Sequence, residues 1–119
     1  MTVKYNKNVN DLAESIKGSY FKIIENFEYG TPKRPLGRIS VVAIRKNRLD
    51  FYQVMDNRTL DKLVSAAKQL RLARKYLGQS GTEFIYTPRY EIESLENVLK
   101  EISNIKGRKH TKKRSNKNP

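Results

Sequence analysis

The feature that most limits the possible folds spans residues 38–55. A stretch of β-branched residues is followed by a short turn and then by a stretch in which apolar residues alternate between two faces. Residues 38–45 are rich in isoleucine and valine, which favours a strand. Asn47 lies in the following turn, and asparagine tolerates the positive φ that such turns require. A strand over residues 49–55 would have one face with Leu49, Phe51, Gln53 and Met55 and another with Asp50, Tyr52 and Val54. The pattern predicts an antiparallel β-hairpin.

The region before the hairpin supports two interpretations. From Asn10 to Phe27 the apolar residues recur with a helical period, and Asn10 is a suitable N-cap. Gly18 and Ser19 interrupt this pattern. A break there would make residues 20–29 a strand, with one face formed by Phe21, Ile23, Phe27 and Tyr29. We expect a helix to about Gly18 or beyond and leave its end open.

After the hairpin the spacing of apolar residues predicts two helices and one strand. Residues 56–59 cap a helix over 60–77, whose apolar stripe is Leu60, Leu63, Val64, Ala67 and Leu70. Residues 82–87 form a short strand ended by Pro88. A last helix over about 91–105 buries Ile92, Leu95, Val98, Leu99, Ile102 and Ile105. The predicted fold class is α+β, with residues 1–106 forming one compact domain.

Length and composition exclude several classes of protein. The chain has 119 residues, enough for one modest core, and contains no cysteine. Its single histidine, His110, lies close to the C-terminus, which argues against a conventional zinc site or a histidine-based triad. We find no signal peptide, lipidation signal or membrane span. The composition predicts an intracellular protein, cytoplasmic or nucleoid-associated, with no cofactor.

The last thirteen residues, Gly107 to Pro119, contain six Lys or Arg and no carboxylate. A segment this polar has almost nothing to bury and cannot offset the entropy of ordering itself. We expect a disordered basic tail over residues 107–119 that becomes ordered against phosphates. The alternative is a tail that serves only solubility.

The rest of the chain is also basic. The whole sequence has 25 basic and 12 acidic residues, so 19 basic residues face 12 acidic ones outside the tail, a net charge near +7. A positive surface attracts polyanions and gains affinity by releasing their counterions. An anionic membrane would be a competing partner, but no long apolar run accompanies the charge. The charge favours nucleic acid, DNA or RNA, as the partner.

Residues 66–77 resemble a helix-turn-helix of small bacterial DNA-binding regulators. In that family a glycine usually occupies the turn, where this chain has Arg71, and a positive φ is unfavourable for arginine. We therefore expect one continuous amphipathic helix with a basic outer face.

Two segments resemble the PD-(D/E)XK nuclease-like fold, and the order of predicted elements over residues 10–87 is similar to it. Residues 35–44 resemble the strand that begins with the catalytic Asp, and residues 49–55 resemble the strand that carries the acid-X-Lys. Here Arg38 or Ser40 replaces the first Asp, Gln53 the second acid and Met55 the lysine. Magnesium requires carboxylate oxygens, so the resemblance implies a nuclease-like core that has lost its metal site.

The candidate nucleic-acid contacts are cations of the loops, the middle helix and the tail. They are Lys33, Arg34, Arg38, Arg45, Lys46, Arg48, Lys68, Arg71, Arg74, Lys75, Arg89, Arg108, Lys109, Lys112, Lys113 and Arg114. Tyr86 and Tyr90 are candidates for stacking on bases, although tyrosines beside a short strand more often lie at the rim of a core. We assign no catalytic residue and no metal ligand.

These observations favour a protein that binds nucleic acid without chemistry. One alternative is a structure-selective nuclease whose metal ligands have moved to Asp50, Asp56 or Glu14. The other is a small viral or mobile-element protein that binds and inhibits a host protein.

Overall fold

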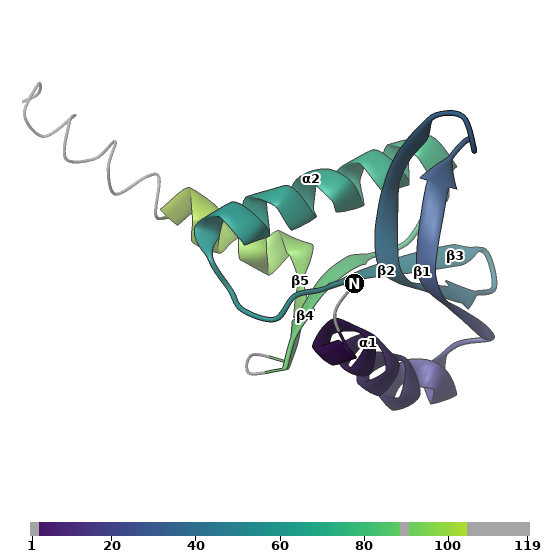
Figure 1. Ribbon diagram of the computed structural model, residues 1–119, viewed down its shortest axis with the longest axis horizontal. Coiled ribbons are helices and arrows are strands. Elements are labelled where there is room, and N and C mark those ends of the chain that lie inside the picture. The colour runs from purple at the N-terminus through teal and green to yellow at the C-terminus, as the bar shows by residue number, and fades with distance from the viewer. Residues whose placement is uncertain (1–2, 89–90, 105–119) are drawn as a thin grey trace, which may run out of the picture.

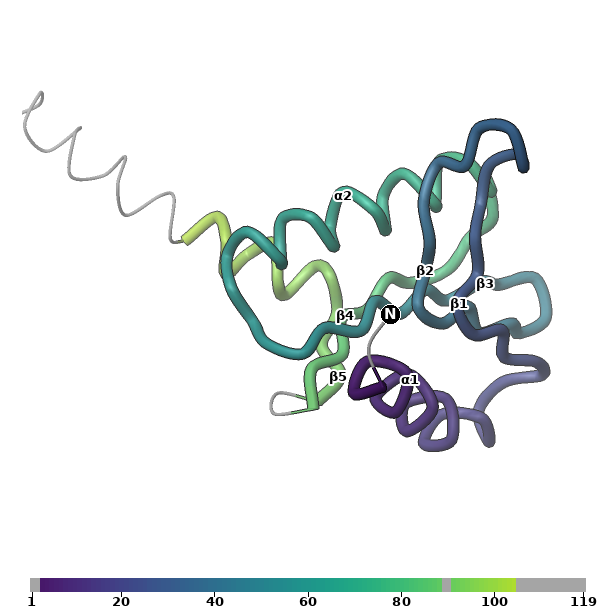
Figure 2. Tube along the Cα trace, in the orientation of Figure 1, coloured from purple at the N-terminus to yellow at the C-terminus, as the bar shows by residue number. Residues whose placement is uncertain are grey.

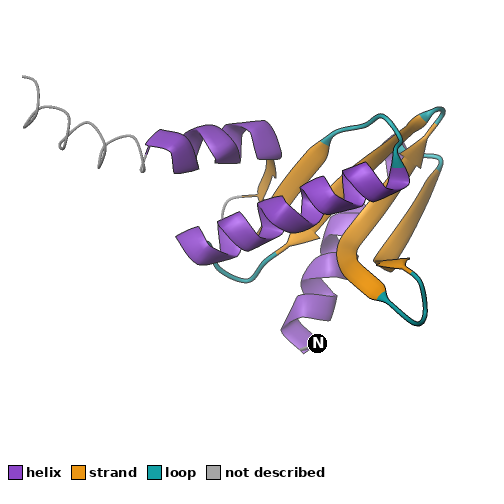
Figure 3. Cartoon of the chain, turned by 90° about the horizontal axis from the view of Figure 1, so that it is seen from above, coloured by secondary structure: helices purple, strands orange, loops and turns teal. Residues whose placement is uncertain are grey.

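The computed structural model describes residues 3–88 and 91–104. Its elements are α1 (Val3–Ile16), a 3-10 turn (Lys17–Ser19), β1 (Lys22–Gly30), β2 (Pro35–Arg45), β3 (Arg48–Val54), α2 (Leu60–Leu77), β4 (Glu83–Thr87) and β5 (Glu91–Ser94). Within these residues the strands form one mixed sheet in the order β1-β2-β3-β4-β5. Helix α1 packs on one face, and α2 with helical residues 95–104 packs on the other (Figures 1 and 3). The fold is α+β, as predicted.

The predicted hairpin is formed by β2 and β3. Asn47 has a φ of 61°, and the strands pair from Arg45–Arg48 to Val41–Tyr52. The two faces of β3 are as predicted, because Phe51 packs toward α2 and Tyr52 packs toward α1. The first strand begins at Pro35 rather than at residue 38. Proline is tolerated there because it needs no partner for an N–H group at the start of a strand.

The N-terminal helix differs from the prediction. It begins at Val3, so Asn10 lies inside it instead of capping it. It ends at Ile16, and the 3-10 turn that follows includes Gly18. The alternative interpretation of residues 20–29 is the correct one, because β1 spans Lys22–Gly30.

The residues expected to share one face of β1 do not do so. Ile23 packs toward α1, whereas Phe27 and Tyr29 pack toward α2. Between them Asn26 has a φ of 52°, which interrupts the regular alternation of the strand. Phe21, the fourth predicted member, precedes the strand and is exposed.

A bend in β2 is stabilised by the side chain of Gln53 on β3. The Ser40 N–H donates to Gln53 Oε1 at 2.8 Å, and Gln53 Nε2 donates to the Arg38 carbonyl at 3.1 Å. Backbone pairing with β3 ends at Val41, so the amide side chain supplies the hydrogen bonds that the sheet no longer makes. The outer halves of β1 and β2 therefore curve toward α2 (Figure 2).

Helix α2 has the predicted bounds and is continuous through Arg71, which excludes the helix-turn-helix. Thr59 caps it by accepting a hydrogen bond from the Lys62 N–H, and Gly78 ends it with a φ of 65°. Leu63, Ala67 and Leu70 are buried as predicted. Leu60 is 38% exposed, contrary to the prediction, because it lies in the first turn of the helix.

The C-terminal part contains an unpredicted strand. β4 pairs in parallel with β3 after the α2 crossover, and β5 pairs antiparallel with β4. Residues 91–94 therefore extend the sheet instead of opening the last helix, and the Ser94 hydroxyl accepts a hydrogen bond from the Asn97 N–H. Ile92 lies on this edge strand and is exposed, contrary to the prediction, whereas Ile105 lies outside the described residues.

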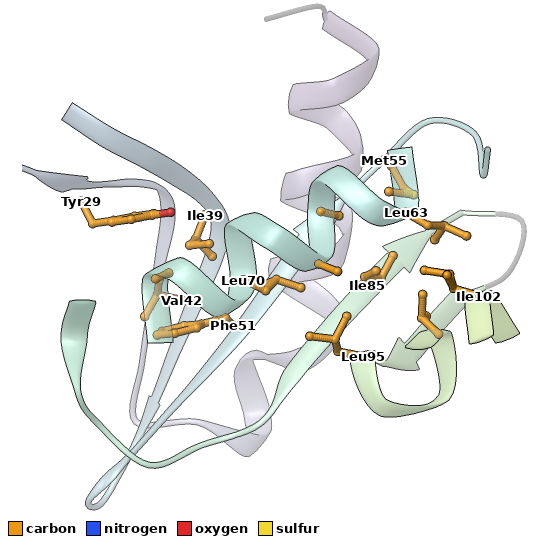
Figure 4. Packing of buried hydrophobic residues seen from close by; sticks show 14 residues of the cluster. Tyr29, Ile39, Val42, Phe51, Met55, Leu63, Leu70, Ile85, Leu95 and Ile102 are labelled. Atoms are coloured by element: carbon orange, nitrogen blue, oxygen red, sulfur yellow. The ribbon is translucent and has the colours of Figure 1, made fainter. Parts of the chain in front are cut away.

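The sheet has an apolar cluster on each face. The larger one lies between the sheet, α2 and residues 95–102, with Phe51, Leu70 and Ile85 at its centre (Figure 4). The smaller one joins Leu12 of α1 to Val41 and Tyr52 of the sheet. A fully buried Leu or Phe side chain stabilises a fold by about 1.5–3 kcal/mol. Within residues 3–88 and 91–104, no helix has the length and hydrophobicity needed to cross a membrane.

Candidate nucleic-acid interface

Three separate segments that carry cationic residues lie along the same side of the molecule, two of them at opposite ends of β2 (right-hand side of Figures 1 and 2). The segments are the β1–β2 turn, the β2–β3 turn and α2 from its middle to its C-terminal end. The helix joins the two turns, because the rings of Tyr76 and Tyr29 lie 5.8 Å apart and Arg74 Nη2 donates to the Leu49 carbonyl at 2.8 Å. We call the exposed cations of these segments the basic rim: Lys33, Arg34, Arg45, Lys46, Arg48, Lys68, Arg71 and Lys75.

The positive charge of the basic rim is largely unneutralised. Among the described residues, Arg48 is its one member in an ion pair, with Asp50 at 3.5 Å. Arg45 lies over the ring of Tyr20, 4.8 Å from its centroid. The sequence has no carboxylate between Asp61 and Glu83, so this part of α2 carries no acid that could pair with its own cations. Seven exposed cations are therefore left to contact an external anion.

Arg74, which the sequence also suggested as a phosphate contact, holds three parts of the fold together. Its Nε donates to Glu83 on β4 at 2.7 Å, and its Nη1 donates to the Gln79 carbonyl at 2.7 Å. Its guanidinium also lies 4.1 Å from the centroid of the Phe51 ring. With Nη2 on Leu49, every nitrogen of the group is engaged, so we do not include Arg74 in the basic rim.

The structure brings together the four residues that the resemblance to the PD-(D/E)XK fold aligns with catalytic residues. Arg38, Ser40, Gln53 and Met55 line one cleft of about 340 Å³ between the sheet, α1 and α2. Ser40 Oγ donates to Gln53 Oε1 at 3.0 Å, accepts from the Val54 N–H at 3.0 Å and lies 2.6 Å from the Tyr5 hydroxyl. Arg38 pairs with Glu28 at 3.1 Å on the neighbouring strand. Ser40 and Gln53 are thus neutral and hydrogen-bonded to each other, and Arg38 is a cation, so none of them supplies the negative charge that a magnesium ion requires.

A second polar cluster lies beneath the β2–β3 turn, in a cleft of about 370 Å³. The Tyr20 hydroxyl donates to Asp50 Oδ2 at 2.7 Å and lies 2.6 Å from the Tyr52 hydroxyl. Asp50 also accepts from the Thr82 N–H at 2.9 Å. Burial, followed by the hydrogen bonds to Tyr52 and Asp50, raises the pKa of Tyr20 above its ordinary value. This cluster joins the β2–β3 turn to α1 and to the start of β4.

The three acids proposed as alternative metal ligands lie apart. Asp50 belongs to the cluster under the β2–β3 turn, whereas Asp56 accepts from Asn8 Nδ2 at 3.3 Å in the other cleft. Glu14 on α1 pairs with Lys17 of the following 3-10 turn. In the part of the chain that the structure describes, no three His, Asp or Glu side chains gather into a group that could hold a metal ion.

Several predicted contacts lie elsewhere. Arg89, Tyr90 and the tail, including Arg108, Lys109, Lys112, Lys113 and Arg114, lie outside the described residues. Tyr86 is half-buried against the cluster under α1. The described chain ends at Asn104, beside Arg58 and the N-terminal end of α2, whereas the basic rim lies at the other end of that helix.

Two aromatic residues at the basic rim were not suggested by the sequence. Phe21 is 89% exposed and Tyr76 is 48% exposed. The pattern of residues 20–29 places Phe21 on an apolar face, and Tyr76 lies near the end of the helix predicted over residues 60–77. Hydrophobicity alone could not reveal their exposure. Two weak signals are the polar or small residues Gly18 and Ser19 shortly before Phe21 and the lysine directly before Tyr76.

Comparisons with known proteins give a structural likeness only. No protein-family model matches the sequence, and no match occurs among curated proteins. The small subunit of the heterodimeric restriction endonuclease R.BspD6I is similar in structure, with 15% sequence identity and a TM-score of 0.46 over 71% of this chain. The match covers 49% of that subunit, so this chain spans about half its length. A TM-score this low supports no inference about activity or partners.

Proposed function

We propose that the protein binds nucleic acid through the basic rim and the tail, without catalysing a reaction. The observation that carries this proposal is the set of seven exposed cations, outside any ion pair among the described residues, that the two turns flanking β2 and helix α2 carry along one side of the molecule. Each cation that neutralises a phosphate releases condensed counterions. The tail adds six more cations. The function implies a location with cellular nucleic acid, in the cytoplasm or on the nucleoid.

The chemistry of the cleft supports a role without catalysis. We interpret the chain as a nuclease-like core whose metal site has been lost. This interpretation rests on the order of elements from α1 to β4 and on the way Arg38, Ser40 and Gln53 share one cleft. An amide and a hydroxyl that already satisfy each other lack the negative charge that holds magnesium. Phosphate contacts position a protein without reading sequence, so the proposal includes no sequence specificity.

A salt titration of the full chain on duplex DNA tests the proposal. If about five or six phosphates are neutralised, log affinity should fall against log salt with a slope of roughly −4 to −5. Fluorescence anisotropy with a labelled duplex measures this slope. A protein that binds no polynucleotide at low salt, or that binds with a slope near zero, would contradict the proposed function.

The absence of catalysis needs its own test. The full chain would be incubated with linear and branched DNA in magnesium and in manganese, and the products separated on a denaturing gel. We expect intact DNA. Cleavage that disappears in Asp50→Ala or Asp56→Ala would overturn the proposal, because only an active site in this chain explains it. Cleavage retained by both variants would instead be checked against a mock purification for a contaminating nuclease.

A further inference from the structure

Two aromatic rings interrupt the basic rim, one near each end of β2. The Phe21 N–H donates to the Ile44 carbonyl at 2.8 Å, which places Phe21 across from the β2–β3 turn and its cations Arg45 and Lys46. Tyr76 follows Lys75 at the end of α2 and contacts Tyr29 near the β1–β2 turn. The rim therefore combines exposed π-faces with unneutralised positive charge.

The exposure of Phe21 is costly for the isolated domain. Leaving a phenylalanine in water forgoes about 1.5–3 kcal/mol that burial would contribute. A single exposed apolar residue is ordinary on protein surfaces. Two exposed aromatic rings within one basic surface are a more specific arrangement. The rings match the bases of a nucleic acid, and the cations match its phosphates.

We propose that the ligand of the basic rim is single-stranded nucleic acid, whose unpaired bases stack on Phe21 and Tyr76. This inference rests on the proposed function and specifies its ligand. Cations such as Arg71 and Lys46 contact the backbone phosphates, and the rings contact the faces of bases. A continuous duplex hides those faces in its own base stack, so it engages the cations alone. Stacking tolerates every base, and a binding preference for single strands therefore needs no sequence specificity.

The chain offers a direct reporter of stacking, because it contains no tryptophan. In Phe21→Trp the new indole is the single tryptophan, and its emission should be quenched when oligo(dT) is added. Heparin, a polyanion without bases, should bind the cations and leave the emission unchanged. Val3→Trp is the matched control, because Val3 is 88% exposed in the first turn of α1. Its emission should respond to neither polyanion.

Binding affinities test the same inference independently. In the full chain, Phe21→Ala and Tyr76→Ala should each lower the affinity for oligo(dT) about tenfold, which corresponds to about 1.4 kcal/mol. Their affinity for a duplex of the same length should stay within about twofold of the unsubstituted chain, as expected for a ligand whose bases are covered. Thermal melting of Phe21→Ala should match the unsubstituted chain because that ring is 89% exposed, whereas Tyr76→Ala also loses the contact with Tyr29 and is compared at a temperature where it remains folded.

The outcomes separate this inference from the proposed function. Quenching of the Phe21→Trp emission by oligo(dT), with a selective loss of single-strand affinity in Phe21→Ala, supports it. Equal losses on single strands and duplex, or no loss on either, would overturn it while binding by the basic rim stands. A chain that binds neither form at low salt would overturn the proposed function, and this inference with it.

Discussion

The two ends of helix α2 use positive charge in opposite ways. At the N-terminal end, the side chain of Arg58 is only 9% exposed and pairs with Glu93 and Glu101 from the C-terminal part of the chain. These contacts raise the pKa of Arg58 further above its ordinary value, chiefly through the hydrogen bond to Glu93. From the middle of the helix to its C-terminal end, Lys68, Arg71 and Lys75 are exposed and have no carboxylate partner among the described residues.

This difference shows that the count of cations does not measure the charge available to a ligand. An arginine whose partners come from distant segments contributes to the fold, and its charge is already neutralised. Arg74 shows the same behaviour next to the rim, because its nitrogens are engaged by Glu83, Gln79 and Leu49. The comparison therefore predicts which cations support the fold and which bind the ligand.

The largest expected effect comes from two arginines three residues apart on α2. Arg74→Ala removes a half-buried ion pair and leaves the Leu49 and Gln79 carbonyls without their donors. We expect the free energy of unfolding to fall by about 3 kcal/mol. Arg71→Ala should change it by less than about 0.5 kcal/mol, because Arg71 is exposed. Urea denaturation followed by circular dichroism measures both values.

The two variants should show the opposite ranking in DNA affinity: Arg71→Ala should have the larger effect and Arg74→Ala the smaller one. At a temperature where both remain folded, Arg71→Ala should weaken duplex binding and Arg74→Ala should not. Equal stability losses in the two variants would break the distinction between structural and ligand-binding arginines. A loss of binding in Arg74→Ala at full stability would do so as well.

Neutralising the helical part of the rim is the next largest effect. The triple variant Lys68→Ala, Arg71→Ala and Lys75→Ala removes three exposed cations and no buried contact. We expect duplex affinity at low salt to fall on the order of 100-fold, with a salt slope shallower by about 2 to 3. Lys100→Ala is the control, since Lys100 is exposed on the C-terminal helical segment and lies 3.9 Å from Glu96. If the control lost as much affinity, the binding would follow total charge and not the position of the cations.

Local patterns in the sequence were sufficient for the hairpin and α2. Asn47 and the alternation of residues 49–55 predict the turn and both faces of β3, and the spacing of Leu63, Ala67 and Leu70 predicts the buried side of α2. These elements were predictable because turn chemistry and hydrophobic period agree within a few residues.

The remaining features depend on contacts between distant segments. β5 has little apolar content and is a strand because it pairs with β4. The structural role of Arg74 depends on Glu83 and on a carbonyl of β3, which no local pattern contains. The exposure of Phe21 likewise depends on the direction in which the 3-10 turn leads the chain into β1. The candidate site was therefore predicted as a set of charged segments, and the structure shows how the two turns flanking β2 and helix α2 are arranged around it.

The tail provides a smaller test of the same comparison. The described chain ends near the N-terminal end of α2, and that helix of 18 residues is about 27 Å long. Deleting residues 108–119 should still make the salt slope shallower by about 1 to 2, because a segment of twelve residues can span such a distance. The affinity of the truncated chain at several salt concentrations measures this. An unchanged slope would confine binding to the basic rim.

The smallest expected effect concerns the cluster under the β2–β3 turn and appears at alkaline pH. Burial raises the pKa of Tyr20 and of Tyr52 above the ordinary 10.0 in the folded protein. Above pH 10 the unfolded chain loses these protons first, so the free energy of unfolding should decrease as the pH rises, while the stabilisation is complete below that pH. Tyr20→Phe with Tyr52→Phe should be less stable at neutral pH by about 1–2 kcal/mol, because two hydroxyls and their hydrogen bonds are lost. Between about pH 9 and pH 11 its stability should fall less steeply than that of the unsubstituted chain. Urea denaturation across this range compares the two slopes, and identical slopes would show that these hydroxyls do not remain protonated on folding.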